Sequence, residues 1–214
     1  MNRTLFVLAV IFLIQLQVFA QSQELPKFEV AGEFTTLERQ AFSQRRTEPG
    51  FGGRFTYNLN EVFSLEAAGY FFPKRCFQCR NGGNITEGVA GVKAGKRFEK
   101  WGIFAKARPG AISFSEGTFD AFPPPVGFPL FPIQFELKRL TTFAMDVGGV
   151  VEFYPSKHIV TRFDVGDTII HFNRRNMNTV LFNELTNTFT PATIPIPART
   201  SHNFQFVTSV GFRF

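Results

Sequence analysis

The sequence predicts an all-β fold, an eight-stranded antiparallel up-and-down transmembrane β-barrel with four long extracellular loops. Two patterns predict it: apolar and polar residues alternate along several segments, and the connections between these segments are long and short in turn. Residues 201–214 show the alternation most clearly, with Phe204, Phe206, Phe212 and Phe214 on one face and mostly polar residues on the other. One oily face and one polar face are typical of a strand between lipid and a polar lumen.

The chain begins with a segment that is typical of a secretory signal peptide. Arg3 precedes an uninterrupted apolar run over residues 5–14, and Ala20 offers a small residue at a cleavage point. The run is shorter than the roughly 20 residues that a membrane-spanning helix needs, so an uncleaved anchor is the less favoured alternative. We therefore expect residues 1–20 to be removed and residues 21–214 to form one barrel domain.

Composition favours strands as the membrane-crossing elements. The chain holds 30 Phe against 3 Tyr and 1 Trp, yet its mean hydropathy is -0.01, because polar residues follow apolar ones. The formal net charge of +6 is a mild excess that fits attraction to anionic lipid headgroups. It predicts no nucleic-acid partner, since no run of Lys and Arg is interleaved with stacking aromatic residues.

Alternation with a period of two marks eight candidate strands. In the first three, phenylalanine recurs on one face, as Phe51 and Phe55 do in the second strand. The fourth is the least regular because its glycines weaken a strand, and Pro109 is expected to end or bend the pairing of the fifth. The sixth and seventh alternate valine and phenylalanine with charged residues. The eight ranges are 27–36, 50–59, 62–72, 85–94, 101–113, 141–154, 158–165 and 201–214.

The connections between these strands keep a strict rhythm. A barrel with both ends in the periplasm has short turns on that side and long loops outside, which requires an even number of strands. A soluble β-sandwich with Greek-key links has no reason to keep this order, so we favour the barrel. The long connections are 37–49, 73–84, 114–140 and 166–200, and the short ones are 58–60, 96–100 and 154–157.

Together these features resemble the small bacterial outer-membrane β-barrel proteins, of the outer-membrane protein A transmembrane-domain type. The resemblance rests on the leader, the eight alternating strands and a last strand that ends Gly211-Phe212-Arg213-Phe214. It implies a location in the bacterial outer membrane, with outer-membrane lipid around the barrel. It also implies that the outer-membrane assembly machinery recognises Phe212 and Phe214 as an assembly signal. It says little about activity.

Charged residues recur on the predicted inner face of the barrel. The interior of an eight-stranded barrel is just wide enough for side chains to fill it, and charges in so narrow a space must be paired. We therefore expect a self-neutralising network that plugs the lumen, in preference to an ion or proton pathway. Its predicted members are Glu29, Glu33, Glu66, Asp146, Glu152 and Asp164, with Arg54, Lys93, Lys106, Arg108, Arg162 and Arg213.

Cys76 and Cys79 form a Cys-x-x-Cys pattern in the second long loop. An oxidising envelope favours a disulfide between them over free thiols. A zinc site would need further ligands, and the histidines His158, His171 and His202 are scattered. We therefore expect neither a metal nor another cofactor.

The loops suggest where a function would lie. Residues 114–140 are rich in phenylalanine and proline, and we expect them to fold over the barrel mouth or to meet a partner. Residues 168–172 and 179–182 read as two strands of one hairpin beyond the membrane. Ser201 and His202 are weak evidence for an enzyme, because neighbours on a strand face opposite sides.

We therefore predict a structural or surface-interaction role without enzymatic activity. Alternatives are a narrow channel or hydrophobic-ligand carrier, a lipid-modifying enzyme, and a barrel that assembles into an extracellular polymer. An extracellular loop partner is compatible with the surface-interaction role, and a hydrophobic ligand is compatible with the carrier role.

Overall fold

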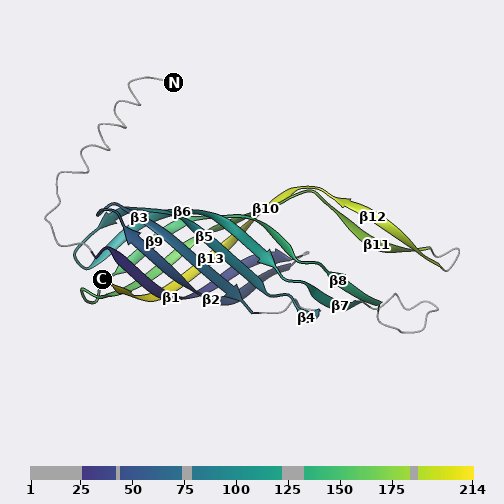
Figure 1. Cartoon of the computed structure of the whole chain (residues 1–214), viewed down its shortest axis with the longest axis horizontal. Helices are drawn as coiled ribbons and strands as arrows, with labels where there is room; N and C mark the ends of the chain where they lie inside the picture. Colours follow the sequence, from purple (N-terminus) through teal and green to yellow (C-terminus); the bar gives the residue numbers. More distant parts are fainter. Residues whose placement is uncertain (1–25, 42–43, 74–78, 122–132, 184–187) are drawn as a thin grey trace, which may run out of the picture.

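The computed structural model describes residues 26–41, 44–73, 79–121, 133–183 and 188–214. Eight strands form a closed antiparallel barrel in the order β1-β13-β10-β9-β6-β5-β3-β2 (Figure 1). Their bounds are β1 Phe28–Ala41, β2 Gln44–Asn58, β3 Phe63–Phe72, β5 Ile85–Arg97, β6 Trp101–Phe114, β9 Leu140–Phe153, β10 Ile159–Phe172 and β13 Arg199–Arg213. The predicted fold class is thus confirmed.

The first and last strands close the barrel. Phe28 donates its backbone N–H to the carbonyl of Phe214 at 2.8 Å, and Phe214 donates to Phe28 at 2.9 Å. The ladder continues from Glu29 opposite Arg213 to Leu37 opposite Gln205. Because every barrel strand has a neighbour on both sides, the wall has no free edge, as a structure surrounded by lipid requires.

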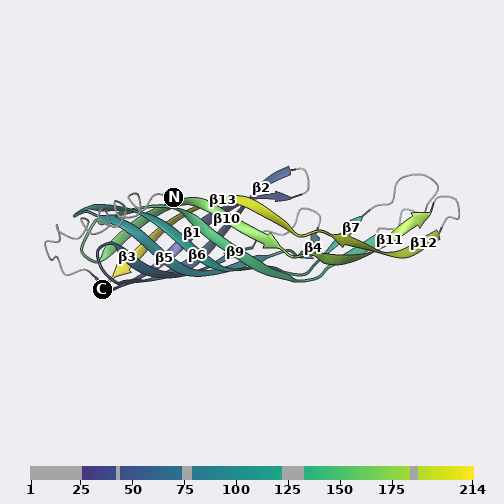
Figure 2. The same ribbon diagram turned by 90° about the horizontal axis from the view of Figure 1, so that it is seen from above.

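Two further sheets lie beyond the barrel, at the end away from Phe214 (Figures 1 and 2). One has three strands in the order β4 (Cys79–Gly82), β7 (Gly117–Ala121) and β8 (Ile133–Leu137), and the other pairs β11 (Arg175–Asn183) with β12 (Thr188–Ile196). Among the described residues, no helix is long and apolar enough to cross a membrane.

The strands run further than the sequence predicted. β1 and β2 stay paired up to Ala41 opposite Gln44, inside the segment expected to be a loop. The prediction that residues 168–172 and 179–182 pair as one hairpin is wrong. Residues 168–172 belong to β10 and pair with the start of β13, from Thr168 opposite Asn203 onwards. Residues 179–182 belong to β11 and pair with β12 instead.

Pro109 interrupts the pairing of β6 on one side but does not end the strand. β6 continues to Phe114, and Pro109 lies opposite Met145 of β9. On its other side the ladder to β5 lacks the pairs of Ala90 and Gly91, between Val89 opposite Gly110 and Val92 opposite Ala107. Proline has no N–H to give that neighbour, so the interruption is local.

The outer wall of the barrel is apolar. Large hydrophobic side chains stand exposed at alternating positions of the barrel strands, for example Phe51 at 58% and Val210 at 63%. Aromatic rings gather at the end that holds the C-terminus. Phe98 stacks on Trp101 at 4.2 Å between ring centroids, and Phe214 lies 5.8 Å from Phe28. An aromatic girdle at the border of an apolar band is typical of membrane barrels.

Adjacent glycines in β2 differ in what surrounds them, and this difference gives a prediction. A Cβ on Gly52 would lie 2.1 Å from the carbonyl oxygen of Gly69 and 2.6 Å from the Tyr70 ring, whereas one on Gly53 would lie 3.5 Å from the Ala31 carbonyl oxygen. Gly52→Ala is expected to destabilise the barrel by about 1–3 kcal/mol, because backbone must move. Gly53→Ala is the matched control and is expected to be close to neutral. Urea unfolding in lipid vesicles measures both, and equal costs would contradict the close approach at Gly52.

Candidate functional site

The lumen is the part of the barrel where polar chemistry is concentrated. The structure places all twelve predicted lumen charges on the inner face, and each is at most 6% exposed. They extend to the end of the lumen that is nearer to Phe214, where Glu29 of β1 is opposite Arg213 of β13. Alternation along each strand puts them there, because every second residue points inward.

Glu66 of β3 is the centre of this charge network. Arg162 of β10 approaches it with both terminal nitrogens, and its Nη2 lies 3.1 Å from Oε2. Lys93 Nζ lies 3.4 Å from Glu66 Oε1, Arg54 Nη1 3.6 Å from Oε1 and Arg108 Nη1 3.5 Å from Oε2. One carboxylate therefore joins cations from four other strands across the lumen.

Asp146 and Asp164 bind Arg108 and Arg162 from a second side, and they bind Lys106 as well. Lys106 Nζ lies 2.9 Å from Asp146 Oδ2 and 3.0 Å from Asp164 Oδ2. Arg108 donates from Nε to Asp146 at 3.0 Å, and Arg162 donates from Nη2 to Asp164 at 2.8 Å. Charges that are buried in this way stabilise a fold only where they are paired and hydrogen-bonded.

The network reaches the barrel end through Glu29, Glu33 and Glu152. Arg54 donates from Nε to Glu33 at 2.9 Å, and its Nη1 lies 3.5 Å from Glu29. Glu152 pairs with Lys93, and Arg213 Nε lies 3.9 Å from Glu29 Oε1. Every predicted member therefore has an opposite charge within 4.0 Å.

Arg97, Tyr154 and Glu87 are functional-site residues that the sequence analysis missed. Arg97 donates from Nε to the Tyr154 hydroxyl at 3.0 Å, and Tyr154 donates to Glu152 at 2.9 Å. The Tyr154 hydroxyl therefore links Arg97 to the Glu152 carboxylate. Arg97 and Glu87 share the inward parity of Lys93, and this signal was available in the sequence.

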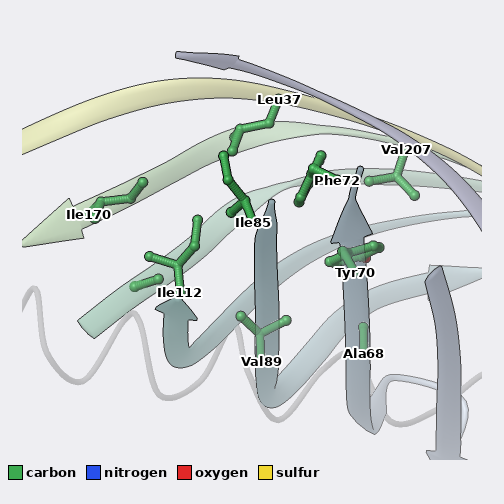
Figure 3. Close-up of a cluster of buried hydrophobic side chains, with 10 residues drawn as sticks. Leu37, Ala68, Tyr70, Phe72, Ile85, Val89, Ile112, Ile170 and Val207 are labelled. Atoms are coloured by element: carbon green, nitrogen blue, oxygen red, sulfur yellow. The ribbon is translucent and has the colours of Figure 1, made fainter. Parts of the chain in front are cut away.

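The other half of the lumen holds a cluster of buried apolar side chains (Figure 3). Inward side chains from several strands pack together there, and most are fully buried. Polar side chains lie among the apolar ones, since Glu87 is between Ile85 and Val89 along β5. Gln205 donates to Glu87 at 3.2 Å and Thr168 donates to Gln205 at 2.5 Å. We call the cluster of buried apolar side chains the apolar cap. It comprises Leu37, Ala68, Tyr70, Phe72, Ile85, Val89, Ile112, Ala144, Ile170 and Val207.

A stack of two aromatic rings between two guanidinium groups lies against the apolar cap. The guanidinium of Arg39 lies 5.4 Å from the ring centroid of Phe114, the Phe114 ring lies 5.9 Å from that of Phe172, and Arg199 lies 5.1 Å from the Phe172 ring. Phe114 and Phe172 both pack against the cap. These residues come from β6, β10, β1 and β13, so the stack spans the mouth of the barrel.

The candidate enzyme residues do not come together. His202 is exposed, and its Nδ1 lies 2.5 Å from Asp167 Oδ2 of β10. Ser201 instead accepts a hydrogen bond from Asn203 Nδ2 at 3.1 Å. His171 contacts the Thr200 hydroxyl at 3.0 Å. In the described ranges, no three His, Cys, Asp or Glu side chains are placed to hold a metal ion.

Some predicted features concern other parts of the chain. The signal peptide, residues 1–20, and Cys76 lie outside the described residues, so the cleavage and the Cys76–Cys79 disulfide stay predictions. Residues 122–132 of the Phe- and Pro-rich loop also lie outside them. Phe212 and Phe214 are exposed on the outer wall, and their rings are 6.1 Å apart. Their role as an assembly signal stays a prediction.

A closed barrel of eight antiparallel strands, apolar outside and charged within, is the fold of the small outer-membrane barrels. The structure of Neisserial surface protein A matches with a TM-score of 0.51 and 9% sequence identity, covering 90% of this chain and 100% of that one, and shows the same fold. The structure of Ail of Yersinia pestis matches with a TM-score of 0.49 and 11% sequence identity, covering 87% of this chain and 96% of that one. The structure of OprG of Pseudomonas aeruginosa matches with a TM-score of 0.47 and 9% sequence identity, covering 92% of this chain and 99% of that one. No protein-family model and no curated protein matches the sequence.

Proposed function

We propose that this protein is a non-conducting barrel of the bacterial outer membrane with a structural or surface-interaction role. The apolar outer wall and its aromatic girdle support the membrane location. The strands and sheets that continue beyond the barrel support the surface role, because they form an ordered platform on the side that carries the long connections.

The observation that carries the non-conducting part is the network around Glu66. It joins cations of β2, β5, β6 and β10 to one carboxylate in the middle of the lumen. A hydrated ion would have to separate these pairs, which have 0–1% side-chain exposure. Separating one partner from a buried pair costs about 3–5 kcal/mol, so the network acts as a plug.

A carrier of hydrophobic ligands is the second candidate function. The apolar cap supports it, since apolar side chains line the half of the lumen that lies under the mouth. Several of these side chains, among them Leu37, Phe72 and Ile170, are 0% exposed, so a ligand would have to displace them. We favour the structural and surface role for this reason. We propose no catalysis, because His202 is paired with Asp167 away from Ser201.

Planar-bilayer recording tests the proposal. The purified protein is expected to give no conductance above that of bare lipid. The variant Phe114→Ala with Phe172→Ala opens the mouth stack and leaves the plug in place, so it too is expected to stay silent. Heat-modifiable gel migration and outer-membrane fractionation check that both proteins are folded and located as proposed. Stepwise conductance of the natural protein would overturn the plug, and conductance of the double variant alone would move the barrier to the mouth.

A further inference from the structure

The ribbon of β11 and β12 stands clear of the barrel wall (Figures 1 and 2). The two strands are paired antiparallel from Arg175 opposite Ile196 to Asn183 opposite Thr188. Their sheet contains these two strands alone among the residues that the structure describes. Each strand therefore has one edge toward its neighbour and one outer edge.

Two prolines determine which backbone groups face each edge. Pairs in an antiparallel ladder alternate between those that exchange two hydrogen bonds and those that exchange none. Pro191 lies opposite Val180, and Pro195 lies opposite Asn176. Since proline has no N–H, both are pairs without hydrogen bonds, and their backbone groups face the outer edges. The prolines are four residues apart, an even number, so each of them independently assigns the same alternate positions to the outer edges.

The two outer edges of the ribbon consequently differ. On β12, the rings of Pro191 and Pro195 take positions where an N–H would meet a new strand, which is a common block of sheet edges. We call this the closed edge. On β11, the outward positions of the same phase are Asn176, Asn178, Val180 and Phe182, and none is proline. We call this the open edge, since no described strand pairs with it.

We propose that the open edge pairs, antiparallel, with the open edge of a second copy of this chain. In such self-pairing, the outward backbone groups of one copy can face those of the other. With Thr179 on the two-fold axis, Asn178 stands opposite Val180 of the second copy and Asn176 opposite its Phe182, so outward N–H and C=O groups meet on both sides. A shift of this register by one residue would place an outward group opposite one that its own ribbon already uses.

The closed edges then limit the assembly to two copies. The product is a four-stranded sheet in the order β12-β11-β11-β12, and both of its outer edges carry Pro191 and Pro195. A two-stranded ribbon is marginally stable in water by itself, whereas a sheet of three or more strands is stable. One open edge and one closed edge thus fit a partner identical to the chain itself.

The antiparallel arrangement also fixes the orientation of the two copies. The ribbon points away from the barrel on the side opposite the C-terminus (Figure 1). Two ribbons that run in opposite directions therefore place their barrels in membranes that face each other. The inference rests on the proposed surface role and gives it a partner: the same protein on an adjacent membrane.

Vesicle clustering tests this pairing. The full-length natural protein is reconstituted in two dye-labelled vesicle populations, and clustering is followed by light scattering and dye co-localisation. Clustering is expected only when both populations carry the protein. Val180→Pro adds a proline opposite Pro191, where the ribbon exchanges no bonds, so the ribbon is kept and its open edge is blocked. The clustering rate is expected to fall about ten-fold, and Val180→Ala, which keeps the N–H, should retain it.

Further outcomes separate the pairing from the plug. Pro191→Val opens the closed edge, and in detergent it is expected to give species larger than the dimer that the natural protein forms at high concentration. Gel heat-modifiability confirms that each variant holds a folded barrel. The pairing is overturned if natural-protein vesicles stay dispersed, or if folded Val180→Pro clusters like the natural protein. Bilayer conductance is measured on the same samples, so a failed plug and a failed pairing give different results.

Discussion

Replacement of Glu66 by glutamine is expected to destabilise the barrel by about 3–5 kcal/mol. The amide keeps the shape of the side chain and removes the charge that Arg54, Lys93, Arg108 and Arg162 share. These cations would then face one another in a narrow space without their common counter-charge. Urea unfolding in lipid vesicles measures the cost. The fluorescence of Trp101, the single tryptophan, reports it from the outer wall.

Two further variants determine whether the cost comes from the network. Glu99→Gln removes an exposed carboxylate in a turn and is expected to cost at most about 0.5 kcal/mol. Arg162→Met in the Glu66→Gln background removes one positive charge from the network, which offsets the lost negative charge, and is expected to recover part of the loss, as a double-mutant cycle would show. A cost below about 1 kcal/mol for Glu66→Gln would contradict a dry ion-paired plug.

The barrel wall was predictable from the sequence because lipid imposes one rule on it. Each membrane strand must present an apolar side chain at every second position, and the positions in between must then point inward. Glu29 and Arg213 lie at the two ends of the chain, yet the same parity places both in the lumen, where they face each other across β1 and β13. Period-two counting was therefore sufficient to place the lumen charges.

The strands beyond the membrane could not be recognised in this way. Outside lipid a strand needs no apolar face, so the ladder from Leu37 opposite Glu48 to Ala41 opposite Gln44 carries no such alternation. Cross-strand register is also invisible in one sequence. The pairing of Ile169 with His202 brings Asp167 beside that histidine, and no local pattern indicates this.

The apolar cap was missed because apolar residues were assigned to the outside. Leu37 lies one residue and Ile170 five residues past the ends of predicted strands, where the inward parity was not continued. The interior of a barrel needs to be filled more than it needs to be polar. Above the charge network, aliphatic and aromatic side chains fill it, and their burial adds hydrophobic stabilisation that charges do not provide.

Phe72→Ala is expected to destabilise the barrel by about 3–5 kcal/mol. The Phe72 side chain is 0% exposed within the apolar cap, and Gly50 opposite leaves room for it, since a Cβ there would lie 2.6 Å from the ring. Truncation removes the buried ring and leaves a cavity that neighbouring strands, tied into a closed ladder, cannot collapse. An apolar cavity of this kind stays dry, so bilayer conductance should remain absent.

Phe71→Ala is the matched control, one residue away on the opposite face of β3. Its ring is partly exposed on the outer wall and lies edge-on to Phe51 at 5.6 Å between centroids. Lipid fills the space that truncation leaves, so the expected cost is the aromatic contact, about 0.5–1.5 kcal/mol. Unfolding in vesicles compares the two variants directly. If Phe71→Ala proved the costlier substitution, the inner face would not be the packed side of this strand, and the apolar cap would have to be reassigned to the outer wall.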